Sequence, residues 1–600
     1  MPRFLPIAPR LNISKNVQVT HSANVNHARS ESVVSINPLD GQNIIAASKR
    51  FRNLHTYDFV VEAAVSFDGG KTWDASSLPL HRDWGVNPGM SDPTIAWDSH
   101  GWAYLFVGPH WKSNDPGDAV GNPAIGIGVW VYISRDGGTS WGTPIEVSGA
   151  RTDDKQWAAS DVSQGSPHYG NVYVAWAAGT PLHFGRSQHP GTAWVGPGGK
   201  TPAQSSLHPN AFAPEVSVGP DGTIYIFWHN DGSTSIELVT SSDGGQSFTA
   251  PRSVVTGIKS IRGHAPATGG WPHFPGGTFR VITLVTGCVV GPKTLMVAWA
   301  DYRDDVSRIY FRRSTDGGQT WEGAASGQPL LNAAIASDTT AHEFHPQIIA
   351  MPNGTVGCAF YEFGPRFRDF ATLGGGNPLR YLIDVVLVAS LDRGVTFSLR
   401  ESVSDRPWNP RTNAPWAHGD SQVTFIGEYF GLDADNEHFQ IVWTDTRTGM
   451  QELFAAKAYV QTSATEWDPR LDTDTVFIPL HGSSGGVLVD RKTGKVIPVP
   501  YPEWNEEFRL RTRANVIRDA GVRRIGMLLD AFAIIEGVSD VAAQSVRTGI
   551  MESIRSIAAE AIVDGQELPE HRLGAGISAL DLPAAVQEAG GDDASLKRPK

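Results

Sequence analysis

The chain alternates short apolar runs with polar, glycine-containing turns. One unit recurs along most of it: an apolar strand, a polar turn, and a second apolar strand that ends in an aromatic residue. Seven copies share this pattern: Pro214–Trp228, Asp92–Phe106, His345–Phe360, Thr278–Trp299, and those that begin at Glu31, Lys155 and Glu428. Apolar runs of this length between such turns predict an antiparallel all-β fold.

A second repeat interleaves with the first. The octapeptide Ser-x-Asp-x-Gly-x-(Thr/Ser)-(Trp/Phe) occurs at Ser66–Trp73, Ser134–Trp141, Ser241–Phe248, Ser314–Trp321 and Ser390–Phe397, the last with Arg393 in place of a glycine. Its aspartate can accept hydrogen bonds from nearby backbone N–H groups, as in Asx turns. Its glycines permit positive φ. We expect a structural turn between the third and fourth strands of each unit, without a catalytic role.

The two repeats together predict a β-propeller. Most units begin roughly 60–67 residues apart, a little above the usual period of a propeller blade. Each unit is interpreted as a four-stranded antiparallel blade. Seven blades are favoured, and six would result if one unit is an insertion. A strand at Asn12–Thr20 is expected to complete the last blade and so remove an exposed sheet edge.

The pattern changes near residue 460. We expect an N-terminal arm and closing strand at 1–24, the propeller at 25–460, a smaller module at 461–589 and a disordered tail at 590–600. Within the module, Val487–Asp490 and Val496–Val499 predict a hairpin. Candidate helices follow at Asn505–Asp519, Arg523–Ile535 and within Ser539–Val563. This mostly helical part would either cap the propeller or form a homo-oligomer.

Composition narrows the class of protein. The 600 residues include 64 glycines, 40 prolines and 19 tryptophans, and only 18% are charged, a profile typical of many short strands joined by tight turns. The net charge of −13 argues against a nucleic-acid partner. No apolar run reaches the ~20 residues of a membrane span. The first residues, Met1–Asn16, lack the apolar core of a signal peptide, so we expect a cytoplasmic protein unless a non-classical route exports it.

Two cysteines, Cys288 and Cys358, allow one disulfide at most, and two buried free thiols are the simpler expectation. Metal-ligand motifs such as His-Glu-x-x-His or paired Cys-x-x-Cys do not occur. We therefore expect no cofactor and no catalytic metal, although an acidic loop leaves room for a structural Ca²⁺.

At this point the chain resembles the bacterial Asp-box (BNR-repeat) proteins of the sialidase superfamily. The resemblance covers about residues 25–460 and rests on the octapeptides and on five further motifs. These are SDPTIAWD (Ser91–Asp98), GNVYVAW (Gly170–Trp176), WADYR (Trp299–Arg303), WTDTR (Trp443–Arg447) and GEYFGL (Gly427–Leu432). The motifs specify the fold well and the activity poorly, because one fold hosts many functions.

The resemblance implies a sialidase-type site: three arginines that hold the substrate carboxylate, a tyrosine nucleophile assisted by a glutamate, and an aspartate acid/base. Carried over by position, these roles fall on Tyr429, Glu215 and Asp58. The arginines match less well, since the family's Arg-Ile-Pro motif has only a loose counterpart in Arg3–Pro6. Three candidates remain for substrate binding: Arg50, Arg303 and Arg447. The last two belong to Asp-x-Arg pairs, which local ion pairs also explain.

The repeat independently predicts a ring of ionisable residues. Equivalent strand starts should converge on the propeller axis, and they are Glu31, Asp92, Lys155, Glu215, His345 and Glu428, with Tyr429 adjacent. Glycosidic cleavage needs a carboxylic acid and a second group that acts as base or nucleophile. Pairs such as Glu215 with Asp92, or Glu215 with Glu428, would serve. His345 with Tyr429 would instead suit a polysaccharide lyase. Four tryptophans could stack on sugars or lie in the core: Trp84, Trp111, Trp157 and Trp228.

We therefore favour a sialidase-like glycoside hydrolase, or a related glycan-cleaving enzyme, that acts on an oligosaccharide or glycoconjugate at the axial mouth. The alternative is a non-catalytic glycan- or protein-binding propeller whose helical C-terminus serves assembly. The ring of carboxylates favours the enzyme, and the poor arginine match favours the binding protein over a strict sialidase.

Overall fold

The computed structural model describes residues 9–461 except 57, 85–87, 112–124, 150–152, 230–233, 333–334, 337–339 and 366–380, together with the backbone of three strands between 475 and 500. It divides into a unit formed by Leu11–Val460 and a second unit formed by Met1–Arg10 with Gln461–Lys600. Within the described residues, no helix has the length and hydropathy needed to cross a membrane.

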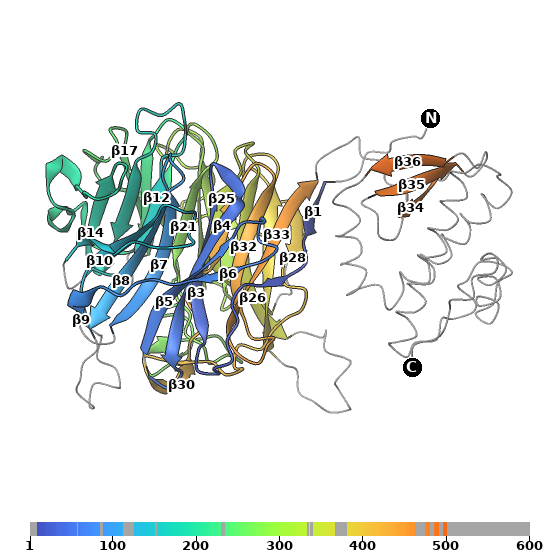
Figure 1. The fold of residues 1–600 in the computed structure, drawn as a ribbon, viewed down its shortest axis with the longest axis horizontal. Coiled ribbons are helices and arrows are strands. Elements are labelled where there is room, and N and C mark those ends of the chain that lie inside the picture. The colour runs from blue at the N-terminus through green and yellow to red at the C-terminus, as the bar shows by residue number, and fades with distance from the viewer. Residues whose placement is uncertain are drawn as a thin grey trace. The chain divides into compact units, whose positions relative to one another are not determined.

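Seven groups of antiparallel strands build the larger unit (Figure 1). In the first half of the chain they are β3 (Arg29–Asn37), β4 (Asp40–Asn53), β5 (Asp58–Ser66) and β6 (Asp74–Ser76); β7 (Gly89–Trp97), β8 (Ala103–Trp111), β10 (Val129–Ser134) and β11 (Ile145–Ser148); β12 (Gln156–Ser160), β13 (Val172–Trp176) and β14 (Ala178–Ser187); and β15 (His208–Val218), β16 (Ile224–His229), β17 (Ser235–Ser241) and β18 (Arg252–Thr256).

The second half supplies β21 (Val285–Val289), β22 (Leu295–Asp301), β23 (Arg308–Ser314) and β24 (Gln328–Pro329); β25 (His342–Ala350), β26 (Val356–Pro365), β27 (Tyr381–Ser390) and β28 (Leu399–Ser402); and β31 (Gly431–Ala434), β32 (His438–Asp445) and β33 (Glu452–Gln461). Short accessory elements are β9 (Ile125–Gly126), β19 (Ala267–Thr268), β20 (Trp271–Pro272), β29 (Trp416–Ala417), β30 (Asp420–Thr424), η1 (Arg82–Trp84), η3 (Pro197–Gly199) and η4 (Pro202–Gln204).

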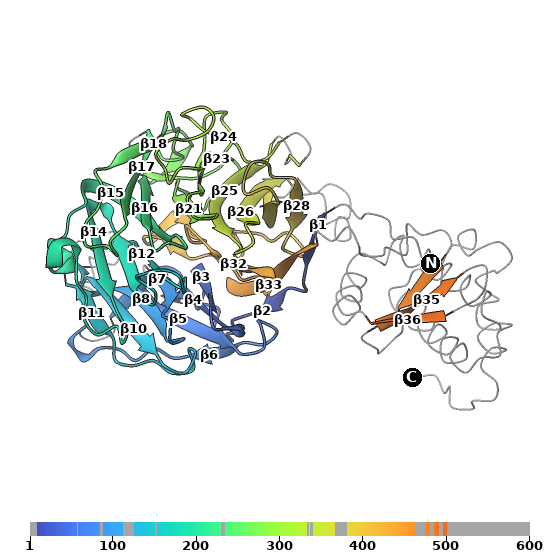
Figure 2. The same cartoon turned by 90° about the horizontal axis from the view of Figure 1, so that it is seen from above.

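The first strands of the seven groups close a ring. β3, β7, β12, β15, β21, β25 and β31 contact one another in that order, and β31 contacts β3. Figure 2 shows the groups arranged radially around a common centre. The third and fourth groups are also joined at their edges, because β14 pairs with β15. This arrangement is consistent with the blades of a β-propeller, and the seven groups coincide with the seven units of the sequence.

The two ends of the larger unit meet in its last group. β1 (Arg10–Ile13) and β2 (Val17–Gln18), from the start of the chain, both pair with β33 near its end. The edge of β33 would otherwise present unpaired N–H and C=O groups to solvent. Pairing with residues from the opposite end of the larger unit covers that edge and closes the ring.

The five octapeptides form one recurrent turn between the third and fourth strands of five groups. In the clearest copy, Asp316 Oδ1 accepts hydrogen bonds from the backbone N–H groups of Gln319 and Thr320, both at 2.9 Å. The hydroxyls of Ser314 and Thr320 also donate to Asp316, at 2.9 and 2.5 Å. These bonds lower the pKa of Asp316 to about 2. The aspartate is thus fully engaged in holding the turn.

The smaller unit contains β34 (Thr475–Pro479), β35 (Gly485–Asp490) and β36 (Val496–Pro500), which form one antiparallel sheet in that order. β35 and β36 contain the predicted hairpin strands, whereas β34 was not predicted. The candidate helices Asn505–Asp519, Arg523–Ile535 and Ser539–Val563 lie outside the described residues, as does the tail from 590.

Candidate functional site at the centre of the ring

Five of the inner strands carry the same backbone kink, either within the strand or, for β12, at the residue just before it. The residue at the kink has a left-handed conformation, with φ of 54° at Glu31, 50° at Asp92, 55° at Lys155, 45° at Ala213 and 50° at His345. Non-glycine residues rarely adopt this conformation, which costs on the order of 1 kcal/mol each. Bulges of this kind re-aim side chains and occur next to active sites. The repeated strain singles out this layer of the ring as a candidate site.

Glu215 lies outside this layer, contrary to the prediction that it begins its strand at the mouth. Ala213 occupies the kink, and Glu215 lies two residues further along β15, past the bulge. Glu215 Oε1 accepts hydrogen bonds from Thr286 Oγ1 at 3.0 Å, Gly287 N at 3.2 Å and Gln347 Nε2 at 3.1 Å. Burial raises the pKa of Glu215 to about 8. This carboxyl therefore ties three neighbouring groups together.

A Glu215→Gln variant should change the pH dependence of stability. Because the pKa of Glu215 is raised from 4.5 to about 8 by folding, the native protein binds a proton that the unfolded chain has lost between those pH values. Stability from this group is therefore present at low pH and is lost as the pH rises towards 8. Glutamine keeps the accepting oxygen without titrating. We expect the melting temperature of the variant, relative to wild type, to be higher at pH 8.5 than at pH 5. An unchanged difference between the two pH values would contradict this assignment.

The two cysteines are free and buried, as the sequence predicted. Burial raises the pKa of both the Cys288 and Cys358 thiols, and the nearby Glu215 carboxyl adds to the effect. Because the thiolate is the reactive form, we expect neither cysteine to react with a thiol reagent such as Ellman's reagent in the folded protein at pH 8, and both to react after denaturation. Labelling of the native chain at the rate of the denatured one would refute this.

Tyr429 stands at the middle of the cluster in the kink layer. Its hydroxyl donates to Asp92 Oδ1 at 3.3 Å, and Lys155 Nζ lies 3.8 Å from the centroid of its ring. The Trp157 ring meets it edge-on, with centroids 6.0 Å apart. Burial, followed by the charges of Asp92 and Glu31, raises the pKa of Tyr429. The phenol is therefore neutral and needs a base if it is to act as a nucleophile.

Asp92 is paired with a carboxyl that the sequence did not single out, Asp154. Burial acts to raise the pKa of Asp92, but Lys49, Lys155 and a hydrogen bond from Asp154 outweigh it, and the pKa is lowered. Desolvation of the Asp154 carboxyl, then the charge of Asp92, raises the pKa of Asp154 to about 8. The two shifts run in opposite directions, so Asp154 is the member of the pair that holds a proton more readily. Such splitting of two carboxyl pKa values is how acid and base roles are assigned. Asp154 is exposed as a residue although its carboxyl is desolvated where it meets Asp92, whereas Asp92 is buried as a whole.

Two buried ion pairs flank Tyr429. Lys49 Nζ lies 2.7 Å from Glu31 Oε2, and Arg280 NH2 lies 2.8 Å from Glu428 Oε1. Burial raises the pKa of Glu31 to about 7 even though Lys49 opposes the shift. Lys49 precedes the candidate Arg50 in the sequence, and Asp154 precedes Lys155. A search for the residues beside each strand start and strand end would have found both. Arg280 lies just before β21, where the repeat is irregular, and no sequence motif points to it.

His345 also lies in the kink layer. Among the described residues, neither of its ring nitrogens has a hydrogen-bond partner, and the side chain is buried. Burial and the nearby Arg280 lower the pKa of His345 to about 3, so the ring is neutral. A neutral imidazole could accept a proton, as the lyase hypothesis requires, but none of the contacts among the described residues joins His345 to Tyr429.

Two residues that the sequence proposed for the site, Arg50 and Asp58, form ion pairs within the first group of strands. Arg50 Nε lies 2.8 Å from Glu62 Oε2, and Arg52 NH2 lies 2.6 Å from Asp58 Oδ1. None of the described contacts brings Arg50 or Asp58 to Tyr429. Asp58 is therefore engaged by a cation, a poor setting for a general acid.

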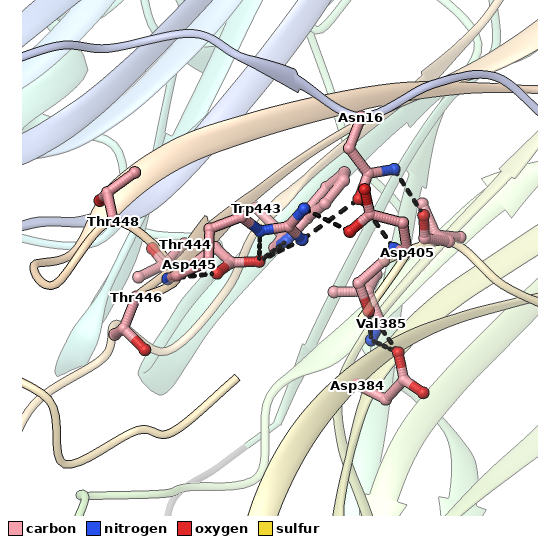
Figure 3. Close-up of polar contacts among 12 residues, drawn as sticks. Asn16, Asp384, Val385, Asp405, Trp443, Thr444, Asp445, Thr446 and Thr448 are labelled. Carbon is pink, nitrogen blue, oxygen red and sulfur yellow. Dashed lines mark hydrogen bonds and ion pairs between the residues drawn. The ribbon is translucent and has the colours of Figure 1, made fainter. Parts of the chain in front are cut away.

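Arg303 and Arg447 lie in two copies of one local arrangement. In each, the arginine bonds the aspartate two residues earlier, at 2.6 Å, and that aspartate accepts the indole N–H of the tryptophan two residues before it, at 3.1 Å. In the second copy, Arg447 also contacts Asp405 and Asn16. Figure 3 shows Trp443 and Asp445 of this copy together with Asp405 and Asn16. Each guanidinium further covers an aromatic ring, Tyr310 or Phe454. Both guanidinium groups are therefore engaged in local ion pairs, as the Asp-x-Arg spacing allowed.

The candidate sugar-stacking tryptophans differ in their exposure to solvent. Trp84 and Trp228 are fully buried in the core, whereas Trp157 is partly exposed beside Tyr429 and Lys155. The side chain of Trp111 lies outside the described residues. Trp157 is thus the one of the three described candidates that remains suited to stack on a sugar.

No protein-family profile and no curated protein matches the chain. Solved structures give distant similarities. A protein of unknown function from Dyadobacter fermentans DSM 18053 is 14% identical, with a TM-score of 0.41 over 76% of this chain and 100% of that one. A Trypanosoma rangeli sialidase in complex with the inhibitor DANA is 12% identical, with a TM-score of 0.38 over 82% and 84%. A mutant α-L-arabinofuranosidase from Fusarium graminearum is 11% identical, with a TM-score of 0.33 over 74% and 97%.

Proposed function

We propose that this protein cleaves glycosidic bonds at the centre of the strand ring, with Tyr429 as nucleophile, Asp92 as its base and Asp154 as general acid. The observation that carries the proposal is the hydrogen bond from the Tyr429 hydroxyl to Asp92. The raised pKa of the neighbouring Asp154 supports its role as the acid. A nucleophile, a base in contact with it and a separate acid are the groups that a retaining cleavage requires.

The proposed reaction has two steps. In the first, the Tyr429 oxygen attacks the anomeric carbon and passes its proton to Asp92, while Asp154 turns from Asp92 and protonates the departing glycosidic oxygen. The second step reverses these transfers: a water molecule attacks the glycosyl–tyrosine bond, Asp154 takes its proton, and Asp92 returns a proton to the tyrosine oxygen. Each group ends in its starting protonation state, so the cycle consumes only water and substrate.

Lys155 is the cation that we propose meets the substrate. Three cations surround Tyr429, but Lys49 and Arg280 are committed to Glu31 and Glu428 at 2.7 and 2.8 Å. Lys155 Nζ faces the Tyr429 ring. This position suits stabilisation of the tyrosine oxygen as it loses its proton. The sugar bound here is an oligosaccharide or glycoconjugate, and an anionic sugar would gain from the same charge.

A panel of aryl glycosides that includes an aryl sialoside tests the proposal, with wild type compared with Asp154→Asn. Wild type should turn over at least one member, and its rate should fall as the pH rises through about 8, where Asp154 loses the proton it donates. The variant should retain much more of its rate on a dinitrophenyl glycoside than on a methylumbelliferyl one, because the better leaving group needs no acid.

The alternative function gives the opposite result. If wild type turns over no glycoside but binds a glycan array, and Tyr429→Phe binds equally well, the protein is a non-catalytic glycan-binding propeller. The ion pairs that already satisfy Glu31 and Glu428 are the feature that favours this second candidate, since they leave fewer groups free for chemistry.

A further inference from the structure

A second cluster of polar side chains lies at the far end of the second and third groups. Asp98 and His100 are in the turn between β7 and β8, and His189 is in the loop that follows β14. Asp98 comes six residues after Asp92 along β7, so roughly 20 Å separates this cluster from the kink layer at 3.3 Å per residue. The cluster is thus independent of the proposed glycosidic site.

Asp98 is buried and organises the cluster. Its Oδ1 accepts hydrogen bonds from the backbone N–H groups of His100 and Trp102, at 2.8 and 3.0 Å. Its Oδ2 accepts from the Tyr104 hydroxyl at 2.9 Å and contacts His189 Nδ1 at 2.7 Å. Because an ionised carboxylate only accepts, the proton of a neutral His189 lies on Nδ1 and the lone pair lies on Nε2. A carboxylate that orients an imidazole in this way is the usual partner of a metal-binding histidine.

The imidazole ring of His100 lies beside that of His189. The His100 and His189 rings are stacked, with centroids 3.8 Å apart and an angle of 24° between their planes. One nitrogen from each ring and one oxygen of Asp98 all lie within 4.8 Å of one another. His100 belongs to a solvent-exposed turn, so its side chain can rotate out of the stack and point its lone pair at an ion shared with His189.

We propose that His100 and His189 bind a divalent first-row transition-metal ion such as Zn²⁺, with Asp98 fixing the orientation of His189 and water completing the coordination. Neutral imidazoles suit Zn²⁺, Cu²⁺ and Ni²⁺, whereas Ca²⁺ requires a shell of oxygen ligands. The ion would join the β7–β8 turn of the second group to a loop of the third. Because the unfolded chain does not hold these residues together, binding would stabilise the native ring.

Zn²⁺ titration of the chelator-treated protein tests the proposal, by calorimetry and by melting temperature in parallel. Wild type should show a saturable site and a rise in melting temperature. His100→Ala should lose both, because His100 is exposed and its removal should leave the fold intact. His21→Ala removes another exposed histidine and should behave as wild type.

His189→Gln should also lose binding. If the His189→Gln variant folds poorly, the decision rests on His100→Ala. That variant should have the melting temperature of wild type in the absence of metal. The proposal is overturned if wild type shows no saturable Zn²⁺ site, or if His100→Ala retains the same affinity and the same stabilisation.

Discussion

Replacing Tyr429 with phenylalanine should reduce kcat/KM for glycoside cleavage on the order of 10³-fold or more, the scale of losing a nucleophile and its proton transfer. The substitution removes one oxygen and leaves the ring that faces Lys155 and Trp157. Binding of substrate should therefore change little, so the loss should fall on kcat. Steady-state kinetics on the best aryl glycoside of the panel would measure it.

Tyr132→Phe is the matched control. Tyr132 is also buried, but its hydroxyl bonds Pro79 O at 2.9 Å and contacts Met90 Sδ at 3.5 Å, and none of its described hydrogen bonds involves Asp92 or Tyr429. It should keep wild-type kcat/KM. If Tyr429→Phe retained more than about a tenth of wild-type activity, the phenol could not be the nucleophile, since acid–base and nucleophilic groups contribute far more than tenfold.

Replacing Lys49 with methionine should destabilise the folded ring by about 3–5 kcal/mol, the cost of leaving one member of a buried ion pair without its partner. Lys49 and Glu31 side chains are only 3% and 2% exposed, and Lys49 also lies over the Phe59 ring at 4.3 Å. Methionine preserves most of the apolar contact and removes the charge. Chemical denaturation of wild type and variant would measure the difference.

The loss of folding stability in the Lys49→Met variant should depend on pH. Without Lys49, Glu31 must take up a proton to remain buried, which costs little near its unfolded pKa of 4.5 and more as the pH rises. The destabilisation should therefore be larger at pH 8 than at pH 5. Adding Glu31→Gln should recover much of the stability at pH 8, and Lys71→Met, in an exposed turn, should have little effect. A loss that is equal at both pH values, with no recovery in the double variant, would show that packing rather than charge is responsible.

The repeats carried most of the information about the fold. A unit that alternates strands with glycine turns can bury its apolar face only against its neighbours, so seven units along the chain became seven groups around a ring. The octapeptides were equally predictable, because the aspartate and glycines of each act within eight residues. The same locality explains why Arg303 and Arg447 could be suspected as structural, since each bonds an aspartate two residues away.

The candidate site was predictable in part. The sequence placed the strand-start residues close together, and this holds for those that lie at a kink, such as Asp92 and Lys155. Both of these residues contact Tyr429, which the sequence had also singled out. Glu215 was misplaced by two residues because the bulge at Ala213 shifts the register, and no local pattern fixes the position of a bulge.

The sequence by itself determined the kind of fold, the number of repeated units and the turns that hold them, because each of these depends on residues close together along the chain. Only the tertiary structure decided which charges meet: Lys49 with Glu31, Asp154 with Asp92, Arg280 with Glu428, and His100 with His189. These partners are brought together by closure of the ring or by strand bulges and loops. Their protonation then follows from burial and from the neighbouring charges that closure supplies.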